Sequence, residues 1–111
     1  MAPKVIRLSE LTANGDFERF QGASLCFGHF NAIHPGHIRY FQTAREHGDQ
    51  LIVGLEGTSQ LPESERNEVF PEVDRAEALA ALNIVDYVVI LDVGPLEELV
   101  KLIKGSSPRN G

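Results

Sequence analysis

The stretch that decides the fold reads SLCFGHFNAIHPGH and covers residues 24–37. Its first part, residues 24–27, is a short apolar run followed by a glycine, which is typical of a buried β-strand. A proline at position 35 suits the first position of a helix, and three of the chain's four histidines lie between residues 28 and 38. Ligands of open α/β sheets bind at such junctions, at the carboxyl end of a strand. The stretch therefore predicts a strand, a helix and the place of a site.

The segments that follow continue the alternation of strand and helix. Apolar residues recur at helical spacing over residues 35–47, and Pro35 and Gly48 are typical of the two ends of a helix. The later elements come in the same order: an apolar strand at 51–55, a helix at 71–82, a β-branched strand at 87–91, a helix at 95–105 and a frayed tail at 106–111.

This order predicts an α/β protein with a three-layer, doubly wound, Rossmann-like parallel sheet. A strand, a helix and a second strand of these lengths make a βαβ unit, whose pairing is parallel and right-handed. Ahead of this unit, residues 5–8 form a short apolar segment, and Ser9 is expected to be the N-cap of a brief helix reaching Phe20. The 111 residues are expected to form one domain, with a functional loop over residues 56–69.

Composition narrows the class of protein. Sixteen acidic against ten basic residues give a net charge of −6 without a basic cluster, so nucleic acid is not an expected partner. No apolar run approaches the length of a membrane span, and residues 1–4 lack the apolar core of a signal peptide. The single cysteine, Cys26, cannot build a disulfide framework and is expected in the core. We expect a cytoplasmic protein without a membrane partner.

Two histidines of the opening stretch, His34 and His37, are the candidate catalytic residues. They flank the start of a helix, where the dipole favours anions, and Gly36 between them would let a ligand approach the backbone. Imidazoles at this position could stabilise phosphate, above all where charge grows in a transition state. The alternatives are a structural histidine pair and a zinc site with Cys26 or His29 as third ligand, and no metal site is assigned.

Residues 26–40 resemble the first signature of the cytidylyltransferase-like nucleotidyltransferases, G-x-F-D-x-x-H-x-G-H. The likeness continues through residues 48–55, 74–76 and 85–89, and extends over residues 5–104. It is strongest with the sugar-phosphate and glycerol-phosphate branch of the family, which includes the heptose-phosphate nucleotidyltransferase domains.

The resemblance implies transfer of CMP or AMP from CTP or ATP to a phosphorylated small molecule such as a sugar or polyol phosphate. Pyrophosphate would be released with the help of Mg²⁺, and a homodimer is implied as well. His34 and His37 would stabilise the charge that builds on the triphosphate. For His29 and Arg75, the alternative to a role in binding is an ordinary solvent-exposed position. The residues implied in nucleotide binding are Gly28, His29, Phe30, Asn31, Gly36 and Arg75.

Three departures from the family pattern bear on function. Asn31 stands where the family most often has Asp, and Arg66 is the one cation of residues 56–69, where many relatives use a lysine on the triphosphate. The segment R-x-x-G-I-S-[ST]-[ST], which completes the nucleotide site in the family, is not found. The chain is therefore expected to be the first two-thirds of a longer enzyme or to have lost the activity. The alternative function is a non-catalytic nucleotide- or anion-binding module within a larger protein.

Overall fold

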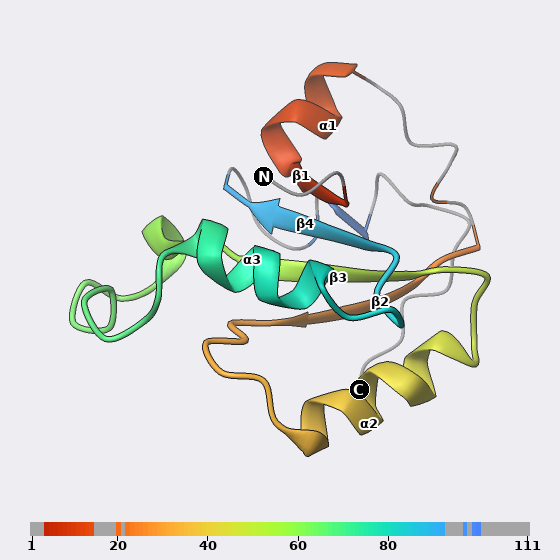
Figure 1. Ribbon diagram of the computed structural model, residues 1–111. Coiled ribbons are helices and arrows are strands. Elements are labelled where there is room, and N and C mark those ends of the chain that lie inside the picture. Colours follow the sequence, from red (N-terminus) through yellow and green to blue (C-terminus); the bar gives the residue numbers. More distant parts are fainter. Residues whose placement is uncertain (1–3, 15–19, 21, 93–96, 98, 101–111) are drawn as a thin grey trace.

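The computed structural model describes residues 4–14, 20, 22–92, 97, 99 and 100, and these residues are built around a parallel sheet (Figure 1). The described strands lie in the order β1-β4-β3-β2, and every neighbouring pair is parallel. This arrangement confirms the α/β, Rossmann-like class predicted from the sequence. The elements are β1 (Val5–Arg7), α1 (Leu8–Asn14), β2 (Ser24–Gly28), α2 (Pro35–Arg45), β3 (Leu51–Glu56), the 3₁₀ helix η2 (Thr58–Gln60), α3 (Glu72–Ala80) and β4 (Tyr87–Leu91).

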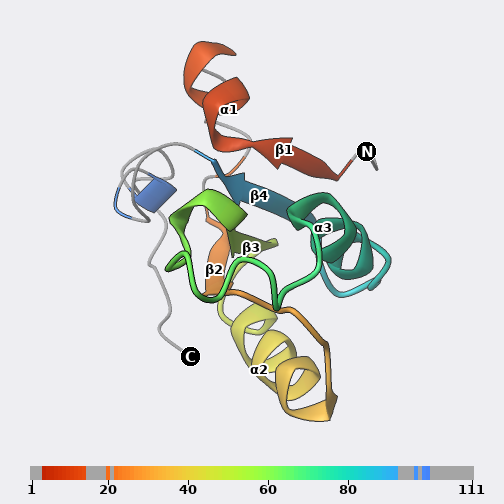
Figure 2. The ribbon, with the colours of Figure 1, turned by 90° about the vertical axis from the view of Figure 1, so that its left-hand side faces the viewer.

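The sheet is covered on both faces, which gives the three layers. Strand β3 lies between β2 and β4, and alternate residues from Leu51 to Leu55 pack with Phe41 of α2 and Leu79 of α3. Figure 2 shows these two helices on the same side of the sheet. On the other face, Ile52 packs in a second cluster with residues of α1. Both faces of β3 are therefore buried, as its unbroken apolar sequence indicates.

The N-cap prediction for Ser9 is wrong, because α1 begins one residue earlier, directly after β1. Ser9 lies inside the helix, and both its backbone N–H (3.0 Å) and its hydroxyl (2.7 Å) donate to the carboxylate of Asp92. The cap is thus supplied by a residue that follows β4, which local sequence could not reveal. The expected continuation of this helix over residues 15–19 lies outside the described residues.

The helix expected at 95–105 also lies largely outside the described residues, as does the tail at 106–111. Its described members, residues 97, 99 and 100, are helical. Leu99 is buried in the cluster on the α1 face of the sheet, and Val100 packs against that cluster. The described residues of this segment agree with the helix predicted there.

The segment after β3, which the composition predicts to be a loop, is held by specific contacts. Leu61 is buried, and Arg66 donates from Nε to the carbonyl oxygen of Leu61 and from Nη2 to that of Ser59, both at 3.0 Å. At its start, the backbone N–H of Thr58 donates to Oε1 of Glu72 (2.9 Å). A short 3₁₀ helix forms between these anchors, so the segment has more order than its polar sequence suggests.

Cys26 lies in the core, between the sheet and α2. Burial raises the pKa of its thiol to about 11, and a hydrogen bond with Tyr40 opposes this effect in part. The thiol is therefore protonated at neutral pH and serves as a small apolar side chain. Among the described residues, no helix has both the length and the apolarity that crossing a bilayer requires.

Gly48, between α2 and β3, generates a prediction about stability. A Cβ there would lie 2.7 Å from both the carbonyl oxygen of Gly22 and the backbone nitrogen of Ser24. Because backbone atoms cannot turn aside as a flexible side chain can, we expect Gly48→Ala to lower the free energy of unfolding by ~1–3 kcal/mol. Urea denaturation followed by circular dichroism measures this. The control Glu46→Ala, at a neighbouring exposed position, should change stability by no more than ~0.5 kcal/mol; equal losses in both variants would contradict the steric explanation.

Candidate functional site

The candidate site is built on the loop of residues 29–34, which joins β2 to α2 at the carboxyl edge of the sheet. Phe30 has a positive φ of 48°, uncommon for a residue with a side chain, and its ring is buried. The ring centroid lies 5.3 Å from the ring centroids of both His37 and Phe41. A Cβ on Gly28 would meet Cζ of Phe30 at 3.0 Å. The buried phenyl ring thus accounts for the glycine at position 28 and for the positive φ of Phe30. It also packs against the imidazole of His37.

His34 and His37 cap the N-terminus of α2 through their side chains. Nδ1 of His34 accepts a hydrogen bond from the backbone N–H of Gly36 (3.0 Å), and Nδ1 of His37 accepts one from the backbone N–H of His34 (3.3 Å). This is a capping box in which two imidazoles take the roles that Ser and Glu usually have. The rings lie 3.9 Å apart between centroids, at 30°. The structure therefore brings the two predicted catalytic histidines into contact.

This capping settles which ring nitrogen can meet a ligand. Because Nδ1 of His34 and of His37 each accept a backbone N–H, the proton of the neutral ring must be on Nε2. Burial, and then the neighbouring imidazole of His34, lower the pKa of His37 below the ordinary value for histidine. With Nδ1 engaged as an acceptor, each ring presents its Nε2–H as the donor that can face a ligand.

The first N–H groups of α2 are already used within the protein. That of Gly36 donates to the His34 ring, and those of His37 (2.9 Å) and Ile38 (3.3 Å) donate to the carbonyl oxygen of His34. A Cβ at Gly36 would lie 2.8 Å from Cε1 of His34. The glycine thus makes room for the folded-over imidazole, a more specific role than the open approach that the sequence suggested. An anion at this helix end would be held by the rings and the dipole rather than by these N–H groups.

His29 and Asn31 both connect the loop to the segment that follows β3. Nε2 of His29 contacts Oε2 of Glu56, the last residue of β3. Oδ1 of Asn31 accepts the backbone N–H of Phe70 at 2.7 Å, which ties the loop to the residue just before α3. The side-chain Nδ2 of Asn31 is a donor, so this position offers hydrogen bonds and no negative charge.

Arg75 enters the site from α3, and its guanidinium lies beneath the loop rather than in solvent. Only 1% of the residue is exposed, and its N–H groups donate to oxygens of four other residues of the protein. Burial lowers its pKa, an effect that the carboxylates of Glu72 and Glu56 oppose. The guanidinium that the resemblance assigns to phosphate binding thus already donates hydrogen bonds to oxygens of the protein.

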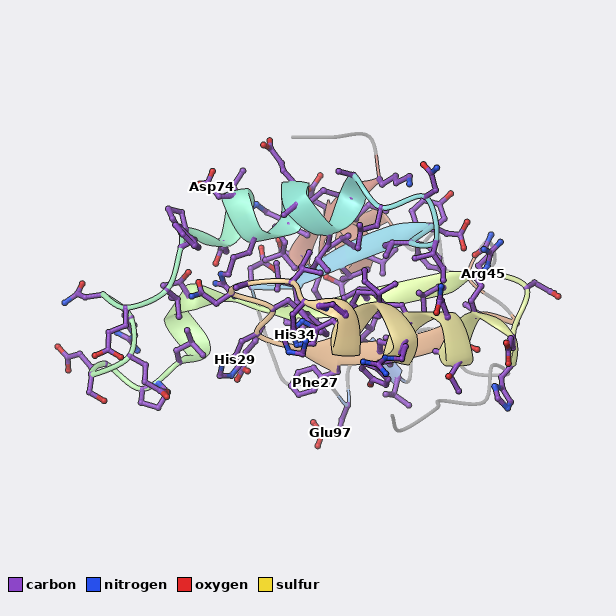
Figure 3. The ribbon with its side chains drawn as sticks, turned by 60° about the horizontal axis from the view of Figure 1, so that its bottom comes forward. Phe27, His29, His34, Arg45, Asp74 and Glu97 are labelled. Carbon is purple, nitrogen blue, oxygen red and sulfur yellow. The ribbon has the colours of Figure 1, made fainter. Side chains whose placement is uncertain are left out.

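A cavity of about 320 Å³ opens between this loop and α3. Figure 3 shows His29 and His34 at the same end of the molecule as Asp74, at the start of α3, with Arg45 at the opposite end. Phe70 is an exposed aromatic residue, 60% accessible, at the rim. The cavity is lined by Asn31, Phe70, Asp74, Arg75 and Ala78.

The residues that the structure describes contain no group of three or more His, Cys, Asp or Glu side chains placed to hold a metal ion. Zinc in structural and catalytic sites needs three or four such ligands. Magnesium that accompanies a nucleotide is held largely by phosphate oxygens and water, with one or two carboxylates.

The structure brings most of the sequence-predicted site residues together, and it adds partners of the loop that the sequence did not indicate. Seven of the eight predicted residues lie in the range 28–37. The eighth, Arg75, lies in α3 and donates a hydrogen bond to the carbonyl oxygen of His29 in the loop. Glu56 was within reach of sequence reasoning, because it directly follows a buried strand at the carboxyl edge of the sheet. Phe70 and Ala78 carried no such signal, since only the packing of α3 brings them to the loop.

Comparison with known proteins places the chain among nucleotidyltransferase relatives. Residues 25–104 match the family described as cytidylyltransferase-like. The bifunctional protein HldE of Geobacter metallireducens is 33% identical over 105 residues, which are 91% of this chain and 21% of that protein. HldE of Nitratiruptor sp. is 40% identical over 79 residues, 69% of this chain and 17% of that protein. This chain thus spans about a fifth of the length of these relatives.

A solved structure has the same fold. It is the lipopolysaccharide core biosynthesis protein from Thermoplasma volcanium, with a TM-score of 0.63 and 26% sequence identity. The superposition covers 74% of this chain and 67% of that one.

The capping geometry predicts the behaviour of His37 in solution. We expect both capping imidazoles in the Nε2–H tautomer at neutral pH, and the titration midpoint of His37 below that of the same residue in the protein unfolded by urea. Because the unfolded state then binds more protons, the stability contributed by His37 is present above the unfolded pKa and is lost as pH falls towards the folded one. Two-dimensional ¹H–¹⁵N NMR of the imidazoles measures tautomer and midpoint. A folded midpoint at or above the unfolded one would contradict this description.

Proposed function

The chain belongs to the cytidylyltransferase-like family, and we propose that it transfers a nucleotidyl group, CMP or AMP, from CTP or ATP to a phosphorylated small molecule. The acceptor class is a sugar or polyol phosphate. In the reaction, an oxygen of the acceptor's phosphate forms a bond to the α-phosphorus. The bond between that phosphorus and the oxygen leading to the β-phosphorus breaks, and pyrophosphate leaves.

The observation that carries this proposal is the capped pair of histidines at the start of α2, whose ring centroids lie 3.9 Å apart. Phosphoryl and nucleotidyl transfer depend mainly on positioning and on donors aimed at growing negative charge. The Nδ1 hydrogen bonds fix the rings of His34 and His37 and leave their Nε2–H groups for the phosphates. Phe30 supports His37 by an edge-to-face ring contact at 83°. We propose that these donors stabilise the charge on the departing pyrophosphate.

Magnesium enters this proposal as the companion of the nucleotide. It would screen the charge of the triphosphate, held by phosphate oxygens and water. The neutral amide of Asn31, already bonded to Phe70, suits a contact to substrate hydroxyl or phosphate better than a contact to the cation.

The cavity between the loop and α3 is the proposed place of the acceptor. In the lining of the cavity, the carboxylate of Asp74 and the amide of Asn31 can hydrogen-bond hydroxyl groups of the acceptor. The exposed ring of Phe70 can cover an apolar face of the acceptor. Four of the five N–H groups of Arg75 are already engaged, so the lining suits the hydroxylated part of the acceptor better than its phosphate. Asn31 belongs to both the loop and the cavity, which would bring the acceptor next to the histidines.

We expect His37→Ala to lower the rate at least ~10²-fold, the usual size for removing a preorganised transition-state donor. The full chain is incubated with CTP or ATP and a panel of sugar and polyol phosphates, and released pyrophosphate is measured. His47→Ala is the matched control, because that residue lies in an exposed position after the other end of α2 and its ring contacts the carbonyl oxygen of Thr43. Its rate should equal that of the unchanged protein.

The outcome also separates catalysis from binding alone. If no substrate pair yields pyrophosphate above the His37→Ala level, the proposed transfer is refuted. Calorimetric titration with CTP and ATP then tests the alternative of a nucleotide-binding module, in which His37→Ala would weaken binding without any reaction to lose.

A substitution in the cavity tests the place of the acceptor. Ala78→Phe fills the cavity from α3, so we expect the KM for the acceptor to rise at least ~10-fold while the KM for the nucleotide stays unchanged. Ala81→Phe, at the exposed C-cap of the same helix, is the control and should leave both constants unchanged. A rise in the nucleotide KM instead would assign the cavity to the nucleotide.

A further inference from the structure

The buried cation of the site, Arg75, has a role that phosphate binding does not explain. It is the largest fully buried side chain among the described residues and lies among apolar neighbours in α3, such as Ala76 and Leu79. Burying a guanidinium costs much free energy unless its N–H groups are hydrogen-bonded. The groups that accept hydrogen bonds from the guanidinium therefore indicate its role in the protein.

Those partners are backbone and hydroxyl oxygens from separate segments. Nη1 donates to the carbonyl oxygens of His29 (2.9 Å) and Glu56 (3.0 Å). Nε donates to the carbonyl oxygen of Phe70 (2.9 Å), and Nη2 donates to Oγ1 of Thr58 (3.1 Å). The loop after β2, the end of β3, the 3₁₀ helix and the turn before α3 thus meet at one planar group. A guanidinium can do this because its five N–H groups have a fixed fork geometry.

Arg75 contacts the carbonyl oxygens of His29 and Glu56 at the point where the pairing of β2 with β3 ends. The β2–β3 register runs to Gly28 opposite Leu55, so His29 and Glu56 are the next residues on the two strands. Nη1 of Arg75 bridges their carbonyl oxygens, and their own side chains are in contact through Nε2 of His29 and Oε2 of Glu56. The guanidinium therefore holds the loop to β3 at the point where the backbone ladder no longer does.

We infer that Arg75 is a positioning residue, whose guanidinium fixes the backbone of the loop 29–34 against β3 and so sets the place of His34 and His37, and which does not itself hold phosphate. The catalytic part of this inference rests on the proposed function. The part that concerns the backbone of the loop does not.

The two roles respond differently to substitution. A lysine can still meet a phosphate as a point charge, but it has no planar fork to reach four oxygens in four directions. Under the positioning role, Arg75→Lys and Arg75→Met both lower kcat by ~10²-fold, the effect of a displacement of about 1 Å at the reacting groups. The KM for the nucleotide stays within about twofold, because uniform binding is retained. Under a phosphate contact, that KM rises and lysine restores most of it.

Hydrogen–deuterium exchange gives a readout that needs no activity. In Arg75→Met we expect the amides of residues 29–34 to exchange at least ~10-fold faster while those of Leu51 to Leu55 in the buried strand β3 do not change. The matched control is Arg66→Met, because Arg66 also donates to two backbone carbonyl oxygens but only within its own segment. It should leave exchange in the histidine loop unchanged.

Thr58→Val keeps the test decisive if Arg75→Met does not fold. It removes one acceptor of the guanidinium and keeps the shape of the side chain, so it should give a smaller change of the same kind: faster exchange in the loop and lower kcat at constant nucleotide KM. Unchanged exchange at residues 29–34 in every folded Arg75 and Thr58 variant would overturn the inference. So would binding of inorganic tripolyphosphate that is lost in Arg75→Met and restored in Arg75→Lys. If the unchanged protein shows no transfer while exchange at residues 29–34 rises as expected in Arg75→Met, the proposed function fails and the positioning of the loop by Arg75 stands.

Discussion

The burial of the first five residues of strand β3, Leu51 to Leu55, is the constraint on which the rest of the structure depends. Its residues from Leu51 to Leu55 are in contact with apolar layers on both faces, and its backbone groups are used in ladders with β2 and β4. A strand with no polar surface along its length leaves polar chemistry only at its ends. At the carboxyl end, three segments converge without a ladder, and side chains must supply the hydrogen bonds that the backbone lacks. The histidine loop, Glu56 and the guanidinium of Arg75 are the residues that supply them.

The fold was largely predictable because its signals are local. Apolar runs and helical spacing gave the strands β2, β3 and β4 and the helices α2 and α3 with bounds close to the observed ones. The exceptions are instructive: Ser9 failed as an N-cap because a carboxylate from beyond β4, that of Asp92, replaced the local signal. In the same way, the polar segment after β3 is ordered by Arg66 and by Glu72 of α3, which composition could not show.

The structure brings the predicted site residues together, but their geometry was not predictable from the sequence. The spacing of His34 and His37 indicated that they flank a helix start, yet not that each accepts a backbone hydrogen bond at Nδ1. That detail changes the chemistry, since it makes the pair a set of oriented Nε2–H donors. Arg75 illustrates the opposite limit: its charge suggested a ligand, whereas its burial, which no local pattern encodes, directs its hydrogen bonds to the protein.

The positive φ of Phe30 sets a limit on transplanting this loop into another scaffold. A glycine would relieve the backbone but would remove the ring that contacts His37 and Phe41. Any host fold would need a large apolar residue in the first turns of the recipient helix to receive that ring. It would also need a glycine at the strand end to leave room for it. The histidine motif is therefore a property of a small three-dimensional unit, and a protein engineer who copied only its letters would not reproduce its shape.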